Sequence, residues 1–253
     1  PPVGWRWTFR IAPVFAGFLR SWPRYGKHPL ARKGLFAIRG TFCGEGRRAY
    51  VAKMTSLPPE TPTATPGFRL WRGALSPRAQ ATLVEEIMRG LEAAPPYQPL
   101  TPGGRPLSVR MSNFGPWGWV SDRGGYRYQA THPLTGRPWP PIPASLLGLW
   151  RATVGWPQPP DACLVNLYHD AAKMGLHQDR DETDLKAPVL SVSLGDTAVF
   201  RIAGPDGGTS TLKLESGDVC ALTGPARLAR HGVDRVLSGS SRLIPGGGRI
   251  NLT

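Results

Sequence analysis

The chain has 253 residues, of which 40% are hydrophobic and 19% charged, so it is long enough to bury one sizeable core. Its formal net charge is +14, but residues 1 to 53 hold eleven Lys and Arg against one acid, Glu45, a net +10 that leaves +4 for the rest. Three cysteines without a C-x-x-C pair exclude a disulfide framework and a zinc ribbon. No apolar run near the start approaches the ~20 residues that cross a bilayer, and we expect no membrane anchor.

Residues 1 to 66 are predicted to be a basic, Pro-rich extension and linker. Residues 1 to 53 show no sustained helical or strand period, which favours a disordered or non-native segment with Met54 as a plausible start. Two alternatives are a basic arm that contacts nucleic acid and an Arg-rich mitochondrial transit segment. Residues 57 to 67 are rich in Pro and Thr and predict a linker, so one domain is expected over residues 67 to 253.

Two helices are predicted in the first half of this domain. Ser76 is a good N-cap, Pro77 suits the first helical position, and Pro95-Pro96 ends the helix. Its apolar positions recur at helical spacing and predict one buried stripe, Leu83, Val84, Ile87, Met88 and Leu91. A second helix is expected over Ala144 to Val154.

Short strands at regular spacing follow the helices. Glycine-containing turns separate most of them, which is typical of an antiparallel sandwich or barrel. Because the predicted helices precede the predicted strands, we expect a mainly β (α+β) fold in which helices support one side of a β core. The expected strands are 162 to 168, 189 to 194, 198 to 202, 211 to 214, 219 to 222 and 249 to 253.

A candidate metal site begins at His177-Gln178-Asp179. If this segment is a strand, both side chains project from one face, because side-chain direction repeats every two residues. With His231 they would form a two-histidine, one-carboxylate site that leaves about three positions of an octahedral ion free, as a ferrous oxygenase needs. An H-x-D pair alone is a weak signal that recurs by chance. Cys163 and Cys220 are expected to be buried strand residues, and His28, His132 and His169 surface residues.

Four polar residues on the neighbouring predicted strands strengthen the metal hypothesis. Asn166 and Tyr168 share one strand face, as do Arg249 and Asn251, and a guanidinium can grip a carboxylate at two points. Together they could bind a dicarboxylate beside the metal. Zinc hydrolysis is disfavoured, since it would not need this pocket.

The chain resembles the AlkB family over most of residues 98 to 253. The resemblance rests on 166 to 168, 176 to 182, 187 to 195, His231-Gly232 and the final Arg249-Ile250-Asn251-Leu252-Thr253. It implies a double-stranded β-helix, a jelly-roll relative, with a nucleotide-recognition lid at about 98 to 130 and a catalytic core at about 160 to 253. It further implies that Fe(II) binds to His177, Asp179 and His231, and that 2-oxoglutarate and O2 are cosubstrates, the former held by Asn166, Tyr168, Arg249 and Asn251.

The same resemblance implies where substrate binds. Trp119 matches the aromatic that stacks on a flipped base, Tyr126 lies beside it, and Asp181 matches an acidic contact to the exocyclic amine; Thr101 and Met111 belong to the lid. An aromatic plane offsets part of the unstacking cost, by ~1 to 3 kcal/mol per base. The alternatives are that Trp119 is a core residue, Tyr126 an ordinary strand residue, and Asp181 part of a solvated acidic turn.

The implied function is oxidative demethylation of N1-methyladenine and N3-methylcytosine type bases, with release of formaldehyde, succinate and CO2. The expected partners are alkylated single- or double-stranded DNA, with RNA as an alternative. Two other hypotheses stay open: a non-catalytic nucleic-acid-binding relative, and a dioxygenase that acts on a protein side chain or small molecule. A bacterial source is expected, since Arg outnumbers Lys 25 to 6, which suggests GC-rich coding. The few, widely spaced cysteines favour a reducing cytoplasm, and a monomer is expected.

Three features depart from the family pattern. The family usually has a second arginine two residues beyond its Arg-x-Asn-Leu-Thr motif, whereas this sequence ends at Thr253, which suggests incomplete ends. Arg105 stands where a lid aromatic is usual. The loop at 205 to 208 is short and lacks the expected basic residue, which puts phosphate contacts there in doubt.

Overall fold

The computed structural model describes residues 57 to 169, 171 to 204 and 206 to 253. The predicted basic extension therefore lies outside the described residues up to residue 56. The described part of the predicted linker is attached to the domain, because the Thr61 amide donates to the Leu70 carbonyl (2.7 Å) and the Thr63 hydroxyl donates to the Phe68 carbonyl (2.6 Å).

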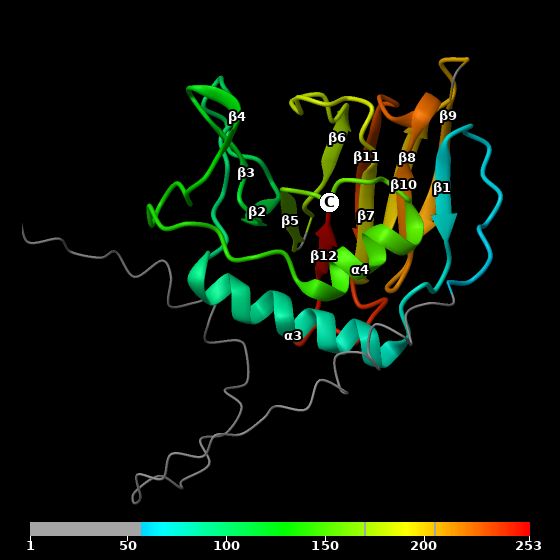
Figure 1. The fold of residues 1–253 in the computed structure, drawn as a ribbon, viewed down its shortest axis with the longest axis horizontal. Coiled ribbons are helices and arrows are strands. Elements are labelled where there is room, and N and C mark those ends of the chain that lie inside the picture. Colours follow the sequence, from blue (N-terminus) through cyan, green and yellow to red (C-terminus); the bar gives the residue numbers. More distant parts are fainter. Residues whose placement is uncertain (1–56, 170, 205) are drawn as a thin grey trace, which may run out of the picture. The chain divides into compact units, whose positions relative to one another are not determined.

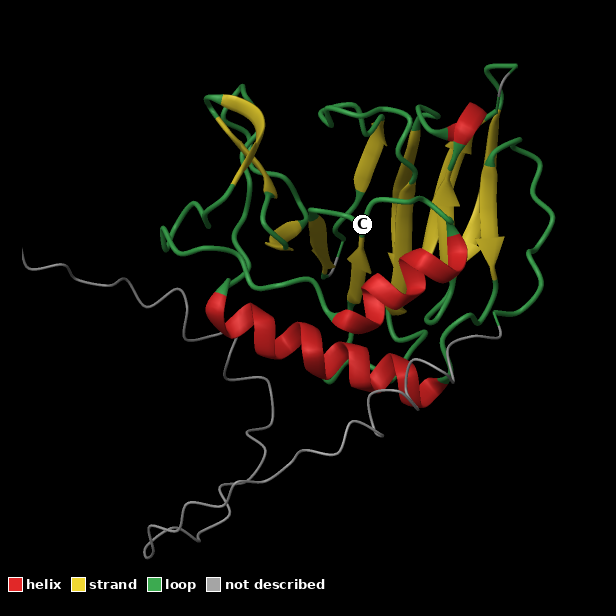
Figure 2. Ribbon diagram, in the orientation of Figure 1, coloured by secondary structure: helices red, strands yellow, loops and turns green. Residues whose placement is uncertain are grey.

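The described residues form two α-helices (Figures 1 and 2), α3 (Pro77–Ala93) and α4 (Ala144–Thr153), and the Ser145 hydroxyl of α4 donates to Glu86 of α3 at 2.8 Å. The Ser76 hydroxyl caps α3 by accepting from the Ala79 amide at 3.3 Å. The predicted stripe of α3 faces the core: Leu83, Val84, Ile87 and Leu91 are buried, and Met88 is half-buried. Both helix predictions are confirmed, the second with its end one residue earlier. No helix in the described ranges combines the length and apolarity that a bilayer crossing requires.

The major sheet has six antiparallel strands. Their order is β1-β10-β7-β12-β5-β2, so the last strand of the chain lies in the middle of the sheet, between β7 and β5. The bounds are β1 (Phe68–Trp71), β2 (Arg110–Phe114), β5 (Cys163–Tyr168), β7 (Val189–Gly195), β10 (Val219–Leu222) and β12 (Arg249–Leu252).

The minor sheet has four antiparallel strands in the order β6-β11-β8-β9, and a separate hairpin joins β3 to β4. The strands of the minor sheet are β6 (Met174–His177), β8 (Thr197–Ala203), β9 (Thr209–Leu214) and β11 (His231–Leu237). The hairpin strands are β3 (Gly118–Asp122) and β4 (Gly125–Gln129), with a short 3-10 helix, η2 (Gly224–Ala226), elsewhere in the chain. The sequence analysis did not identify β1 to β4, β6 or β11.

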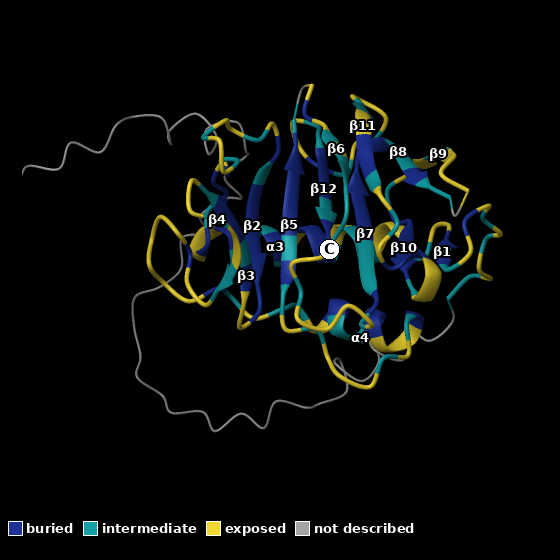
Figure 3. Cartoon of the chain, turned by 90° about the horizontal axis from the view of Figure 1, so that it is seen from above, coloured by how far each residue is buried: buried dark blue, intermediate teal, exposed yellow. Residues whose placement is uncertain are grey.

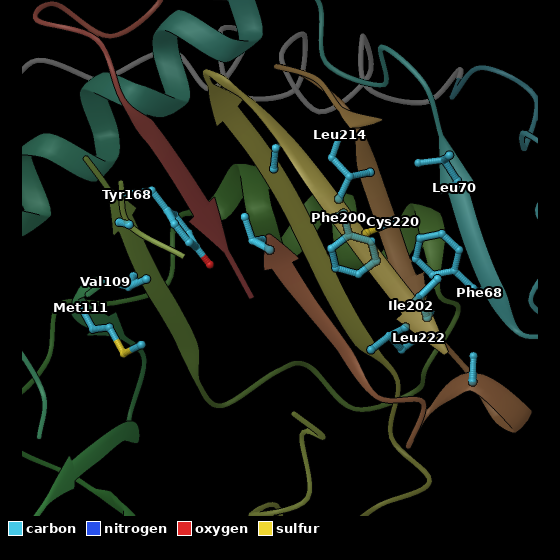
Figure 4. Close-up of a cluster of buried hydrophobic side chains, with 14 residues drawn as sticks. Phe68, Leu70, Val109, Met111, Tyr168, Phe200, Ile202, Leu214, Cys220 and Leu222 are labelled. Carbon is cyan, nitrogen blue, oxygen red and sulfur yellow. The ribbon is translucent and has the colours of Figure 1, made fainter. Parts of the chain in front are cut away.

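The two sheets enclose the core between them. Apolar side chains from both sheets form one cluster, which contains Phe68 and Cys220 from the major sheet and Phe200, Ile202 and Val233 from the minor sheet (Figure 4). Buried side chains of this size contribute about 1.5 to 3 kcal/mol each to folding. The predicted jelly-roll fold is thereby confirmed, and Cys163 and Cys220 are buried as expected.

Helix α3 approaches the major sheet closely near β2. A Cβ at Gly90 would lie 2.1 Å from the Phe114 ring, so only glycine allows this contact without a shift. The Ser112 hydroxyl donates to the Ala94 carbonyl at 2.7 Å just beyond the helix. Most residues of β2 and β5 are buried, whereas many residues of the connecting loops are exposed (Figure 3). The helix fixes the edge strand that leads into the β3–β4 hairpin.

The expectation that His132 lies on the surface is wrong. Its side chain is buried beside Tyr97 and Trp139, whose rings lie 5.5 and 5.1 Å from its own. Nε2 lies 2.7 Å from the Pro95 carbonyl and donates to it, while Nδ1 accepts from the Leu134 amide at 3.1 Å. A ring nitrogen that accepts carries no proton, so the imidazole is neutral and supports the turn next to the hairpin.

We predict that His132 makes the free energy of unfolding depend on pH. Burial lowers the pKa of His132 below its usual range, with a smaller contribution from Arg137 and an opposing one from the Pro95 carbonyl. A group whose pKa is lower in the folded state stabilises the fold above its unfolded pKa of about 6.5 and loses that contribution as the pH falls. Denaturant unfolding, measured above and below a pH of about 6.5, should show a lower free energy of unfolding at the lower pH. In His132→Gln the loss should be smaller; equal slopes in the two proteins would contradict the prediction.

Candidate functional site

Three potential metal ligands converge at the end of the β6–β11 strand pair in the minor sheet. His177 is the last residue of β6 and His231 the first of β11, and the two are direct partners in the ladder. Asp179 lies beyond the end of β6, so the premise that it shares a strand with His177 is wrong. Its carboxylate nevertheless reaches both rings, with Oδ1 3.5 Å from His177 Nε2 and Oδ2 3.5 Å from His231 Nε2. The three ligand atoms lie within 4.8 Å of one another.

The ring orientations suit metal binding. Nδ1 of His177 lies 2.9 Å from the Gly175 carbonyl, and Nδ1 of His231 lies 3.0 Å from the Ala229 carbonyl. Each Nδ1 therefore donates to a backbone oxygen, which leaves the Nε2 lone pair for a ligand, as in other histidine metal sites. This arrangement also fixes the plane of each ring.

Charge at the site favours a cation. Burial raises the pKa of the Asp179 carboxyl, but the hydrogen bond with His177 and the charges of His231, His177 and Arg227 outweigh it, so the pKa lies below its usual range. Burial lowers the pKa of His231, whereas for His177 burial is outweighed by the contacts with Asp179, which raise the pKa. Asp179 Oδ2 is buried and lacks a hydrogen-bond partner within the described residues. An ionised carboxylate with an unused oxygen beside two oriented imidazoles fits a divalent ion.

The four predicted cosubstrate residues lie together inside the barrel. Arg249 pairs with Tyr168, and Asn251 with Asn166, across the β12–β5 ladder. Residues directly opposite in a ladder share a face, so all four side chains project into the space between the sheets. Burial raises the pKa of Tyr168 to about 12, which keeps its hydroxyl protonated and able to donate.

Arg249 is a wholly buried cation without an anionic partner. Its Nη2 donates to the Ser193 hydroxyl at 2.9 Å, and its other hydrogen bonds go to backbone carbonyls at 3.4 Å. It forms no ion pair in the part of the chain that the structure describes. Arg249 Nε and Asn166 Oδ1 also lack hydrogen-bond partners there. Because an uncompensated buried charge is costly, these residues fit a carboxylate ligand such as 2-oxoglutarate.

A groove of about 1570 Å³ is lined by two of the three metal ligands, but neither by His231 nor by the four predicted cosubstrate residues. Its walls include His177 and Asp179 from the metal cluster and four of the predicted substrate residues, Trp119, Tyr126, Asp181 and Met111. Thr101 is not among its lining residues. The Thr101 hydroxyl instead accepts from the Arg105 amide at 3.0 Å and shapes the turn that carries both residues.

Trp119 is held as a rigid wall of this groove. Both polar groups of the Asn113 side chain bond to its backbone at 3.0 Å, and its indole Nε1 donates to Asp181 Oδ2 at 2.8 Å. Tyr126 stacks on it with ring centroids 5.5 Å apart and an interplanar angle of 19°, and 52% of Tyr126 is exposed. Trp119 also packs against the apolar cluster between the sheets. It is therefore both a core residue, as the alternative prediction had it, and a residue of the groove wall.

The sequence analysis did not single out several residues that shape the site. Ser193 lies opposite Asn251 on β7, a position that strand register could have indicated. Arg227 and Glu182 form an ion pair at 3.2 Å beside the metal cluster, and Tyr128 donates to Glu182 at 3.0 Å. No local spacing connects these three residues, since they come from segments far apart in the chain.

Comparison with known proteins agrees with this geometry. The family described as the 2OG-Fe(II) oxygenase superfamily matches residues 67 to 253. An α-ketoglutarate-dependent dioxygenase AlkB homolog of Caulobacter vibrioides is 57% identical over 209 residues, which cover 82% of this chain and 95% of that protein. AlkB of Escherichia coli is 40% identical over 188 residues, 72% of this chain and 86% of that protein. The solved structure of OsALKBH1 matches with a TM-score of 0.66 at 30% identity, covering 77% of this chain and 98% of its own.

We predict that Arg249→Lys weakens 2-oxoglutarate binding about tenfold or more. Lysine keeps the charge but loses the two-point fork, and a hydrogen bond to a charged group contributes about 1.5 to 3 kcal/mol. Calorimetric titration with Mn(II) in place of Fe(II) measures the affinity without turnover. The matched control is Arg201→Lys, whose arginine pairs with Asp234 at 2.8 Å outside the cluster. Unchanged affinity in a folded Arg249→Lys protein would contradict the assignment.

Proposed function

This chain belongs to the AlkB family of the 2OG-Fe(II) oxygenase superfamily, and we propose that it removes alkyl groups oxidatively from damaged nucleic-acid bases. It is a dioxygenase that uses Fe(II), 2-oxoglutarate and O2. The observation that carries the proposal is the position of the Trp119–Asp181 pair on the same groove as His177 and Asp179.

We assign His177, Asp179 and His231 as the iron ligands, and Asn166, Tyr168, Arg249 and Asn251 as the 2-oxoglutarate site. Bound together, the iron, 2-oxoglutarate and O2 supply the oxidation that places a hydroxyl on an N-alkyl carbon, with succinate and CO2 as coproducts. Arg249 matches one carboxylate of the cosubstrate, and its burial strengthens that pairing. The Tyr168 hydroxyl and the Asn166 amide offer further hydrogen bonds, whereas the Asn251 amide nitrogen already donates to Ser191 and to the Val192 carbonyl.

The chain's own contribution is to place the alkyl carbon and exclude water. The Trp119 indole offers a plane for the base, and Asp181 offers a carboxylate oxygen to an exocyclic amine. Once the methyl group is hydroxylated, its carbon–nitrogen bond breaks, the electron pair stays on the ring nitrogen, and the hydroxyl loses its proton as formaldehyde leaves. A lesion of the N1-methyladenine or N3-methylcytosine type has its alkyl group on the base edge that such a contact would present to the iron.

We propose single-stranded DNA as the preferred form, with duplex DNA and RNA as poorer or alternative substrates. A target base must leave its stack to enter the groove, and this costs least where no duplex has to be opened. Residues 54 to 253 carry a net charge of only +4, so phosphate attraction should be modest and salt-sensitive. We further propose a monomer that acts in the cytoplasm of a bacterium, as befits the bacterial origin of relatives with high identity.

The test is mass spectrometry of a single-stranded oligonucleotide that carries one N1-methyladenine. Incubation with the chain, Fe(II), 2-oxoglutarate and air should remove one methyl group, and Asp179→Ala should abolish the loss because one iron ligand is gone. Tight oligonucleotide binding without methyl loss would instead favour a non-catalytic binding protein. Neither binding nor methyl loss would favour a protein or small-molecule substrate.

A second prediction concerns Trp119. Trp119→Leu should raise KM for the methylated oligonucleotide about fivefold to a hundredfold, since base stacking on an aromatic contributes about 1 to 3 kcal/mol. Trp119→Phe retains a stacking plane and should recover most of the loss, although it lacks the bond to Asp181. Steady-state kinetics of the three proteins measures the effect. If the leucine variant matches the parent, Trp119 is a packing residue and the base binds elsewhere.

A further inference from the structure

Asp179 lacks the backbone support that the two histidines have. His177 and His231 end paired strands, whereas Asp179 follows the end of β6 in a segment without regular structure. A side chain on such a segment needs another restraint if it is to hold a metal at fixed distance, because a misplacement of about 1 Å is enough to impair catalysis.

Arg227 supplies that restraint. Its side chain is only 4% exposed, and its guanidinium reaches three acceptors of the segment that contains Asp179. Nη1 donates to the Asp179 carbonyl at 2.5 Å, Nε to the Ala187 carbonyl at 2.5 Å, and Nη2 to Glu182 Oε2 at 3.2 Å. The rigid, planar fork of arginine can hold two carbonyls and a carboxylate at once, which a lysine cannot.

Glu182 extends this contact to the hairpin. Its second oxygen, Oε1, accepts from the Tyr128 hydroxyl at 3.0 Å. Burial, together with the nearby charge of Glu182, raises the pKa of Tyr128, so its hydroxyl remains a donor. Tyr128 pairs with Trp119 across the β3–β4 ladder, and Tyr126, on the same face, stacks on Trp119. One chain of contacts therefore runs from the base-binding wall to the backbone of Asp179.

We propose that Tyr128, Glu182 and Arg227 form a positioning relay that holds Asp179 in place for the metal and ties its position to the hairpin that bears Trp119 and Tyr126. The relay rests on the proposed function, since it serves the same metal and base sites. None of the three side chains touches the metal ligand atoms; they act on the backbone and on the neighbouring loop. Outer contacts of this kind typically change metal affinity by about ten- to a hundredfold.

The test measures binding of Co(II) alone to the full chain by the absorption of the bound ion, without substrate or turnover. Arg227→Lys keeps the charge and should weaken Co(II) binding about tenfold or more. Tyr128→Phe removes one hydroxyl at the far end of the relay and should weaken binding about fivefold, the effect of one hydrogen bond. In a Glu182→Gln background, Tyr128→Phe should cause a smaller further loss, because the two residues act through one path.

Tyr97→Phe is the matched control. Its hydroxyl is also buried beside the hairpin and donates to the Trp119 carbonyl at 3.4 Å, but it has no contact with Glu182 or Arg227. It should bind Co(II) as the parent does. An equal loss in Tyr97→Phe and Tyr128→Phe would show general loosening of the hairpin and overturn the relay.

The remaining outcomes separate the relay from the function. In one outcome, Asp179→Ala abolishes Co(II) binding while folded Arg227→Lys and Tyr128→Phe bind Co(II) as the parent does. That result would support the metal site and contradict the relay. If Arg227→Lys does not fold, the relay is tested by the Co(II) affinity of Tyr128→Phe and by the double-mutant cycle of Tyr128→Phe with Glu182→Gln. A parent that binds no Co(II) overturns the metal assignment and the relay with it.

Discussion

The buried guanidinium of Arg249 is the constraint on which the rest of the site depends. Strand β12 lies in the middle of the major sheet, so a cation at its start is removed from water on every side. The preceding loop is organised around the buried Asp196 carboxylate, which accepts from the Ser241 amide at 2.9 Å and the Gly248 amide at 3.0 Å. The fold thus fixes the guanidinium but gives it no ion pair within the described residues, and a bound dicarboxylate would offset the cost of burying that charge.

This polar centre divides the space between the sheets. Toward β1 and β9 the interior is closed by Phe68, Phe200 and Leu214, which stabilise the fold by excluding water. Toward β5 and β12 the interior contains amides, hydroxyls and the guanidinium, which contribute little to stability without a ligand. Tyr168 and Met111 belong to the same apolar cluster as Phe68 and Phe200, so the core and the polar pocket adjoin within one interior.

Much of this arrangement could be predicted because it depends on short-range periodicity. The Ser76 cap, the α3 stripe and the facing of Arg249 and Asn251 follow from helical or strand spacing alone. The position of Asp179 could not be predicted in this way, because its carboxylate turns toward the histidines from beyond the end of a strand, held by Arg227 from 48 residues away. His132 was misjudged for a similar reason: its burial depends on Pro95, Tyr97 and Trp139, which tertiary folding brings around it.

The stacked pair of Trp119 and Tyr126 forms part of the wall of the groove. Their ring centroids are 5.5 Å apart, so Tyr126 covers one face of the indole, and the tyrosine is itself half exposed. Separating an aromatic pair costs about 0.5 to 1.5 kcal/mol, whereas stacking a base returns about 1 to 3 kcal/mol. Trp119 is fixed by Asn113 and Asp181, so the exposed tyrosine is the member that can move. Under the proposed function, a base that replaced Tyr126 would exchange one aromatic contact for another, while the indole and the groove wall behind it stayed in place.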